Sequence, residues 1–243
     1  MARGPELKID IEAKRFPGLG APLFERFRLA VAPSSVVALV GPSGVGKSTL
    51  LRMVGGIDAT FTGKVLIDGI VAADAPPAGF VFQDSRLLPW LTALDNIRAV
   101  RVETTRDEAA ALLAQVGLAG YENTYPHALS GGMQRRVALA RAFSVNPRLL
   151  LLDEPFVSLD RHLVGEVQEV FLNLVRAREA TVMLVTHLSE DAARLADRAV
   201  VLGGRPARIV GDLVLDGTRG NRSQAEIWQA AMAIDGLVPA PTC

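Results

Sequence analysis

The residue types and spacing that best suit chemistry occur at nine consecutive positions, Gly41-Pro42-Ser43-Gly44-Val45-Gly46-Lys47-Ser48-Thr49. They follow the pattern G-x-x-x-x-G-K-S/T, in which glycines let successive backbone N–H groups converge on phosphate oxygens. An apolar, β-branched run at 35–40 precedes the loop and apolar residues at helical spacing follow it, so a strand leads through the loop into a helix. The pattern predicts a nucleotide-binding loop, in which Lys47 reaches the β and γ phosphates and the Ser48 hydroxyl binds Mg²⁺.

A second chemical feature is a pair of carboxylates, Asp153 and Glu154, that follows four leucines at 149–152. The leucine run predicts a buried parallel strand, and the carboxyl end of such a strand is where a phosphate-loop enzyme holds its Mg²⁺-organising acid. We therefore expect Asp153 to take that part and Glu154 to orient or deprotonate an attacking water. Alone, the pair would be ordinary charge at a strand end; beside the phosphate loop, the functional interpretation is favoured.

The composition narrows the class of protein. The 243 residues carry 26 basic and 26 acidic side chains, which gives no electrostatic case for a nucleic-acid partner. No stretch approaches the roughly 20 apolar residues of a membrane span, and Met1–Asp10 lacks the apolar region of a secretory signal. The single cysteine, Cys243, predicts neither a disulfide framework nor a cysteine metal site. The high apolar content leaves open that a partner covers part of the surface.

The chemical residues are positioned by strands that alternate with helices. Strands are expected at 7–13, 24–31, 35–40, 64–68, 79–82, 149–153, 181–185, 199–202 and 209–215. Helices are expected after the phosphate loop, from the capping box at Thr105 and Glu108, at 133–145, after 160 and at 224–232. This order predicts an α/β fold with a mostly parallel sheet, an N-terminal antiparallel β region and a helical subdomain inserted at about 87–142. A C-terminal tail occupies about 217–243.

Four further motifs indicate a family. They are Leu129-Ser130-Gly131-Gly132-Met133-Gln134, then Gln83, the Ser158-Leu159-Asp160 turn and His187. Together with the phosphate loop and Asp153-Glu154 they resemble, in the same order, the motifs of ATP-binding-cassette (ABC) ATPases. The resemblance covers about 7–205 and implies a single ABC ATPase domain over 1–243.

The resemblance also implies roles. Ser130, Gly131 and Gly132 would bind the γ-phosphate of an ATP held mainly by a second copy of the chain, and a serine-capped, glycine-rich helix start suits an anion. The result is a head-to-tail homodimer around two MgATP. By the same resemblance, Gln83 would contact Mg²⁺ and the attacking water, and His187 the γ-phosphate. The remaining nucleotide contacts implied are Phe16, stacked on adenine, and Asp160.

A narrower resemblance comes from Leu87-Leu88-Pro89-Trp90-Leu91-Thr92-Ala93-Leu94-Asp95-Asn96-Ile97, Tyr125-Pro126-His127 and Asp153-Glu154-Pro155-Phe156. These stretches resemble the ATPase subunit of nitrate/sulfonate/taurine-type importers. That family implies transmembrane permease subunits that dock near Leu87–Leu91, a peripheral place at the cytoplasmic face of the inner membrane and, indirectly, a solute-binding protein. Trp90 has an alternative interpretation, as part of the core of the helical subdomain.

Other functions remain as alternatives. One is the ATPase of an ABC exporter or lipoprotein-release system, against which only 87–97 argues. Another is a soluble ABC ATPase acting on DNA or ribosomes, although such proteins usually carry a coiled-coil insert or a second cassette. A purely regulatory cassette is disfavoured because Lys47, Asp153, Glu154 and His187 are all in place. The transported solute would be selected by other chains.

Overall fold

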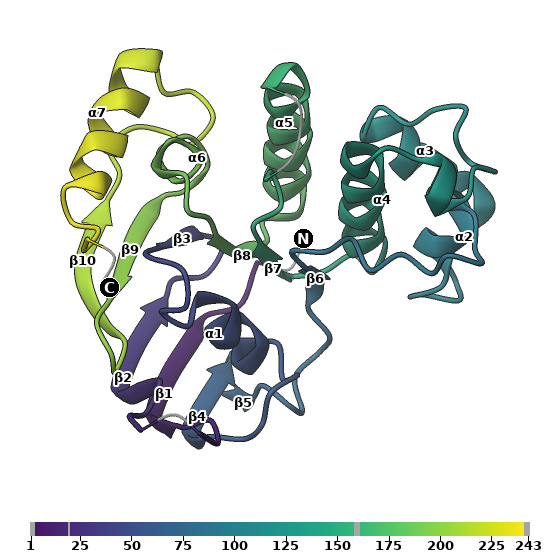
Figure 1. Ribbon diagram of the computed structural model, residues 1–243. Helices are drawn as coiled ribbons and strands as arrows, with labels where there is room; N and C mark the ends of the chain where they lie inside the picture. Colours follow the sequence, from purple (N-terminus) through teal and green to yellow (C-terminus); the bar gives the residue numbers. More distant parts are fainter. Residues whose placement is uncertain (1–2, 19, 158–160, 241–243) are drawn as a thin grey trace.

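The computed structural model describes residues 3–18, 20–157 and 161–240, with only the backbone at 161–163. The predicted Ser158-Leu159-Asp160 turn therefore lies outside the described residues. The described part consists of two sheets, helices packed on them and a separate group of helices (Figure 1). No helix of the described part is long and apolar enough to cross a membrane.

The first sheet is antiparallel and includes the N-terminal strands. Its order is β2 (Phe24–Val31), β1 (Leu7–Lys14), β4 (Thr62–Ile67) and β5 (Ile70–Val71). Leu7, Ile9 and Ile11 are buried on one face of β1, whereas Lys8 and Glu12 on the other are exposed. This alternation is typical of a sheet with one wet face, and it confirms the predicted antiparallel β region.

The second sheet is mostly parallel. Its order is β10 (Arg208–Val214), β9 (Arg198–Gly203), β3 (Val36–Val40), β8 (Thr181–Val185), β7 (Leu149–Asp153) and β6 (Gly79–Val81). Only the β9–β10 pair is antiparallel. Because β3, β6, β7 and β8 run in the same direction, the segments that follow them leave the sheet at one edge.

The parallel sheet is buried on both faces, and β3 shows how. Val37 and Leu39 belong to the cluster formed with helix α1 (Lys47–Val54) and the antiparallel sheet. Val36, Ala38 and Val40 belong to a second cluster. The helices that contribute to that cluster include α5 (Arg161–Arg178), α6 (Ser189–Leu195) and α7 (Gln224–Asp235), together with the C-terminal half of the helix at 131–144. Figure 1 accordingly places α1 between the two sheets, with α5, α6 and α7 beyond the parallel sheet.

A group of helices lies between β6 and β7 in the chain and to one side of the sheets (Figure 1). Its elements are α2 (Ala93–Arg98), α3 (Arg106–Gln115), the 3-10 turn Pro126–Ala128 and α4 (Gly131–Ser144). They enclose a core of their own, which includes Leu94, Ile97, Leu113 and Val137. We call this group the helical lobe. Helix α4 packs partly on the core of the lobe and partly on the main core.

Two elements, β5 and α6, were missed altogether, and two more, α2 and the 3-10 turn Pro126–Ala128, were expected only as part of the helical insert at about 87–142. The two-residue strand β5 is too short to show an alternation, although the Asp68-Gly69 turn before it has the positive φ values that a tight hairpin needs. Helix α6 has seven residues, fewer than periodicity can reveal. Helix α7 extends three residues beyond the predicted end at 232, and it buries Ile227, Ala231 and Ile234.

Candidate functional site

The phosphate loop joins β3 to α1 and requires glycine at two points. Gly41 has a φ of 151° and Gly46 a φ of 111°, which side chains disfavour. A Cβ would also lie 2.4 Å from the carbonyl oxygen of Leu202 at the first position and 2.8 Å from the Phe24 ring at the second. Gly46 ends the loop as the left-handed N-cap of α1. Packing and backbone geometry thus shape the loop that the pattern predicted.

Lys47 is folded back onto this loop. Its Nζ donates to the carbonyl oxygens of Gly41 at 2.7 Å and Pro42 at 3.0 Å, and the side chain is buried. Burial lowers the pKa of Lys47, while the nearby charges of Glu154 and Asp153 oppose the shift. A buried ammonium group is therefore already held at the anion-binding loop.

Ser48 and Asp153 form a pair of oxygen ligands beside the loop. The Ser48 hydroxyl donates to Oδ1 of Asp153 at 2.9 Å. Burial raises the pKa of Asp153, the hydrogen bond from Ser48 opposes this, and the charge of Glu154 raises the pKa further. Hydroxyl and carboxylate oxygens suit Mg²⁺, which commonly takes one or two protein oxygens together with substrate phosphates. The described residues contain no cluster of three or more His, Cys, Asp or Glu side chains that could hold a metal ion.

Glu154 comes directly after β7 in an unusual backbone conformation, with φ at 50°. Its N–H donates to the carbonyl oxygen of Val185 at 2.9 Å, and its Oε1 lies 3.4 Å from Nδ1 of His187. The strand register explains why Glu154 and His187 lie close together, because Asp153 at the end of β7 lies opposite Val185 at the end of β8. The structure thus brings His187 to the adjacent residues Asp153 and Glu154, from which it is distant in the chain.

The predicted signature residues form the N-terminus of α4. Ser130 is the N-cap, and its Oγ accepts a hydrogen bond from the Met133 N–H at 3.2 Å. Ser130 and Gly131 are exposed and Gly132 is partly so. Among the described residues, no hydrogen bond or ion pair joins Ser130–Gly132 to the phosphate loop of the same chain. The helix start therefore presents its N–H groups outwards.

Two predicted residues, Gln83 and Phe16, make no hydrogen bond to Ser48, Asp153 or Glu154 in the described part of the chain. Gln83 follows β6, leaves the sheet at the same edge as Asp153 and is exposed. Phe16 is 38% exposed, and Nζ of Lys14 lies 4.7 Å from the centroid of its ring. Asp160 lies outside the described residues.

Trp90 lies on the surface, with 70% of its area exposed. The alternative interpretation of Trp90 as a core residue of the helical lobe is therefore wrong. The backbone of the loop that carries Trp90 is hydrogen-bonded to the side chain of Asn96, which is fully buried. Asn96 Oδ1 accepts from the Leu88 N–H at 2.8 Å, and its Nδ2 donates to the carbonyl oxygens of Leu88, Leu91 and Thr92.

Two residues of functional interest were missed by sequence reasoning, Asn96 and Arg135. The only signal for Asn96 is an amide among the apolar Ala93, Leu94 and Ile97 of a short helix. Arg135 donates to the carbonyl oxygen of Glu154 at 2.6 Å. Nothing local marks Arg135, because that oxygen is brought to it only by the tertiary fold.

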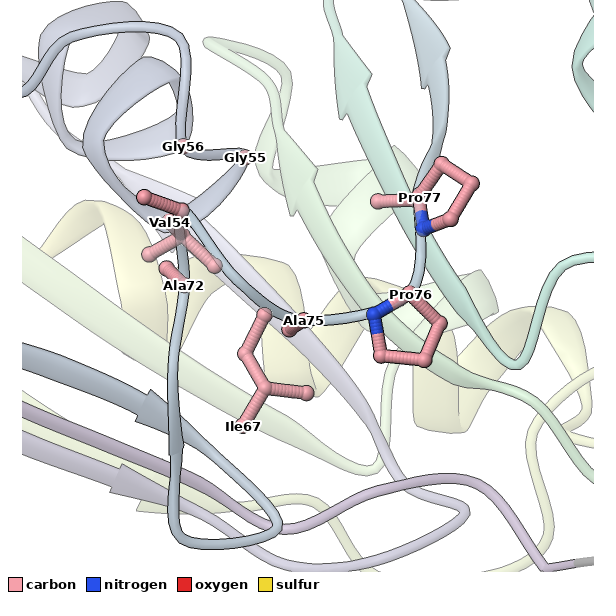
Figure 2. Close-up of a pocket in the computed structure, with 10 residues that line it drawn as sticks. Val54, Gly55, Gly56, Ile67, Ala72, Ala75, Pro76 and Pro77 are labelled. Atoms are coloured by element: carbon pink, nitrogen blue, oxygen red, sulfur yellow. The ribbon is translucent and has the colours of Figure 1, made fainter.

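A separate cavity of about 210 Å³ lies between the end of α1, β4 and the segment 72–78. Figure 2 shows its lining, which consists of glycines, alanines, Pro76, Pro77 and the aliphatic side chains of Val54 and Ile67. None of these residues belongs to the predicted site. The cavity offers no group for acid, base or metal chemistry.

The phosphate loop, the carboxylates at the end of a neighbouring parallel strand and the inserted helical lobe define a nucleotide-hydrolysing α/β protein of the phosphate-loop class. Residues 24–157 match the family model described as ABC transporter. The aliphatic sulfonates import ATP-binding protein SsuB of Bacillus subtilis (strain 168) is 40% identical over 207 residues, which cover 83% of this chain and 81% of that protein. SsuB 1 of Xanthomonas axonopodis pv. citri (strain 306) is 42% identical over 212 residues, covering 84% and 83%. The chain belongs to the ABC transporter family.

A solved structure supports the same assignment. The ATP-binding cassette MJ0796, a dimer in a post-hydrolysis state bound to ADP and Pi, matches with a TM-score of 0.77 and 29% identity, covering 88% of this chain and all of that one. The family, the fold, ATP binding and the ATPase prediction are therefore confirmed. The names of the relatives favour an importer subunit over the exporter and soluble-ATPase alternatives.

Proposed function

We propose that this chain is the ATP-binding and ATP-hydrolysing subunit of an importer for a small solute of the sulfonate, taurine or nitrate kind. The solute class is suggested by the relatives' names. Ser48 follows the buried Lys47 in the chain, and Asp153 precedes Glu154. The observation that supports the ATPase part is the 2.9 Å hydrogen bond from the Ser48 hydroxyl to Asp153. It assembles a phosphate-binding cation, oxygen ligands and a carboxylate at one sheet edge.

Nucleotide binding is assigned to the loop and its flanks. Backbone N–H groups of 41–49 would hold the phosphates, and Lys47 would exchange its carbonyl partners for phosphate oxygens. Ser48, Asp153 and Gln83 would hold Mg²⁺, which supplies neutralisation of phosphate charge. Phe16, which is exposed, would stack on adenine. Each of these residues would bind or orient the nucleotide or Mg²⁺.

Hydrolysis is assigned to Glu154, which would orient a water or take its proton. His187, at 3.4 Å from that carboxylate, would hydrogen-bond the transferring phosphate. The left-handed backbone of Glu154 and its hydrogen bond to Val185 hold the carboxylate at the sheet edge. Catalysis of this kind depends on positioning and preorganised charge.

The active form would be a head-to-tail homodimer of two single-domain chains, each spanning 1–243. The exposed helix start at Ser130–Gly132 would complete the site of the opposite chain, and Asp160 would lie among the shared nucleotide contacts. The exposed N–H groups of α4 support this arrangement. A helix N-terminus favours an anion, and the described residues of the same chain place no carboxylate in hydrogen-bond contact with this one.

Coupling to transport would use the loop Leu87–Leu91. Trp90 projects from it into solvent while buried Asn96 fixes its backbone, as suits a prepared docking surface. Transmembrane permease subunits would dock there, which places the protein at the cytoplasmic face of the inner membrane. A solute-binding protein would act through those subunits, and no nucleic acid takes part.

The test is Glu154→Gln, compared with Glu169→Gln, which makes the same change on the exposed side of α5. The first variant should bind MgATP at near wild-type affinity but hydrolyse it at least about a hundredfold more slowly, a loss within the range for removal of a general base. The second should behave as wild type. Near-normal turnover by Glu154→Gln would remove Glu154 from the proposed reaction.

A further inference from the structure

Arg135 connects the helical lobe to the residue proposed as the catalytic carboxylate. It lies in the second turn of α4, five residues after Ser130, and is partly buried. Its Nη1 donates to the main-chain carbonyl oxygen of Glu154 at 2.6 Å. Burial lowers the pKa of the Arg135 guanidinium, and the charges of Glu154 and Asp84 oppose that shift. Asp84 directly follows Gln83, so Arg135 lies where three functional segments meet.

The carbonyl that Arg135 binds belongs to a residue whose backbone needs support. Glu154 has a φ of 50°, a region that residues other than glycine adopt only when their surroundings hold them there. On the amino side, the Glu154 N–H is held by the carbonyl of Val185 in β8. On the carboxyl side, the carbonyl oxygen accepts from Arg135 in α4 at 2.6 Å and from the Val157 N–H at the longer distance of 3.4 Å. A charged donor makes the stronger kind of hydrogen bond.

We propose that Arg135 is a positioning residue that sets the carboxylate of Glu154 in its own chain, so that helix α4 serves both ATP sites of the dimer. The inference rests on the proposed function. Ser130–Gly132 at the start of α4 complete the partner's site, and Arg135 aligns the site of its own chain. A movement of α4 relative to β7 changes the contact with the Glu154 carbonyl, and with it the direction of the carboxylate. The two sites are thereby linked through one rigid element.

The neighbouring Arg136 provides a contrast. It is buried and donates to the carbonyl oxygens of Val116 and Gly117 at 3.1 and 3.3 Å. Both partners belong to the helical lobe, so Arg136 stabilises the lobe and touches no residue of the site. The two adjacent arginines thus offer a matched pair of variants. They separate the effect on Glu154 from the general loss of an arginine–carbonyl hydrogen bond.

The first experiment measures steady-state ATPase activity and melting temperature for Arg135→Ala, Arg135→Lys and Arg136→Ala. Arg135→Ala should lower kcat about tenfold or more and leave KM for ATP within about twofold, because the contact aligns a group used in the chemical step. Arg135→Lys should recover part of the rate, since its ammonium group can donate to the same carbonyl. Arg136→Ala should lower the melting temperature, with any loss of activity following the loss of folded protein.

Several results would overturn the inference. One is an unchanged kcat in folded Arg135→Ala; another is a loss of rate that runs parallel to a loss of stability, as for Arg136→Ala. If Arg135→Ala does not fold, Arg135→Lys and Arg135→Gln decide, and equal, wild-type rates in both would contradict a role for the charged donor. Glu154→Gln in the same assay separates the two levels. An active Glu154→Gln removes Glu154 from the proposed reaction and with it the basis of this inference, whereas an inactive one beside a normal Arg135→Ala refutes only this inference.

Mixed dimers test whether Arg135 acts within its own chain. Pairing a Lys47→Ala chain with a wild-type chain leaves one site, formed by the wild-type loop and the other chain's Ser130. Arg135→Ala placed in the chain with intact Lys47 should slow single-turnover hydrolysis about tenfold. Placed in the Lys47→Ala chain, it should have no effect. The opposite pattern, or equal slowing in both, would show that Arg135 acts through the signature residues or the lobe.

Discussion

Lys47 and Asp153 are buried ionisable groups at the phosphate loop, and their burial lowers the stability of the nucleotide-free protein. Burial lowers the pKa of Lys47 and raises the pKa of Asp153, so both charged forms are disfavoured before a ligand arrives. Such perturbed groups at one edge of a sheet are typical of functional sites. MgATP would supply the missing counter-charges. The residues are thus arranged for the complex more than for the empty protein.

This arrangement leads to a prediction for Asp153→Asn. The amide can still accept from Ser48 but carries no charge, so the nucleotide-free variant should melt roughly 1–4 °C higher at neutral pH. The same variant should lose the Mg²⁺ dependence of ATP binding. Differential scanning calorimetry and ATP titration with and without Mg²⁺ measure the two effects. A lower melting temperature together with intact Mg²⁺ dependence would contradict this account of the site.

The pH dependence of that difference has a definite sign. Because the folded-state pKa of Asp153 is raised, the folded protein holds the proton more readily than the unfolded chain, and its stability falls as pH rises between the two pKa values. The advantage of Asp153→Asn should therefore be greatest at neutral pH. It should shrink as pH is lowered and the wild-type carboxyl becomes protonated. An advantage that grew on acidification would exclude Asp153 as its source.

Residues 41–49, Asp153 and Glu154 could be recognised in the sequence because their chemistry is tied to a contiguous pattern. The strand, the glycine loop and the helix are consecutive, and Asp153 ends a run of leucines. Asn96 and Arg135 could not be recognised in this way. Asn96 binds main-chain groups of the preceding residues 88–92, and Arg135 binds the main-chain oxygen of the distant Glu154; a main-chain group has no signature in the sequence. His187 needed the family resemblance, since only the register of β7 and β8 brings it to Glu154.

The loop before α2 is the element through which the membrane subunits are proposed to act, and Trp90 is its exposed part. Trp90→Ala should leave the melting temperature and the partner-free ATPase rate nearly unchanged, because the side chain is 70% exposed. It should weaken assembly with the permease subunits by about 2 kcal/mol or more, roughly thirtyfold in affinity. Trp228→Ala on α7, where the tryptophan is also exposed, is the matched control. Equal assembly by both variants would argue against docking at Trp90.

Asn96 lies in the same part of the lobe, but its substitution is expected to lower the stability of the protein, which Trp90→Ala should leave nearly unchanged. Asn96→Ala removes a fully buried amide and strands the Leu88 N–H, at a cost of about 1–3 kcal/mol. At roughly 2–4 °C per kcal/mol for a domain of this size, the melting temperature should fall by several degrees. Asn173→Ala on the exposed side of α5 should change it little. An unaltered melting temperature in Asn96→Ala would show that the loop does not depend on this amide.

Among the elements, those with strong local signals were predictable. The capping box at Thr105 and Glu108 starts α3 one residue later, and Gly117 follows its end with a φ of 70°. The buried strands β3, β7 and β8 lie where the apolar runs predicted them. Helix α6 could not be predicted from the sequence because its position is determined by packing. Its buried alanines and Leu195 contact the main core, and Arg222 donates to the carbonyl oxygens of Ala193 and Ala196.

At the scale of the whole molecule, α4 is the element on which the proposed mechanism depends. Its N-terminus presents Ser130–Gly132 outwards, and its second turn holds the Glu154 carbonyl of the same chain. Gln134 and Arg141 of the same helix hold the segment between Gln83 and Trp90, through the Ser85 side chain and the carbonyls of Ser85 and Arg86. A partner that docks on the loop Leu87–Leu91 would therefore act on a helix that is proposed to serve both sites.

The central claim is that two chains share each ATP site, and ATP retention by a mixed dimer tests it most directly. One chain carries Lys47→Ala, the other Ser130→Arg, and both carry Glu154→Gln to prevent hydrolysis. If the sites are shared, one site contains both lesions and the other neither, so the purified mixed dimer should retain one ATP at the affinity of the Glu154→Gln parent. If each chain forms its own site, every site carries a lesion. Retention of no ATP by a correctly assembled mixed dimer would contradict the account.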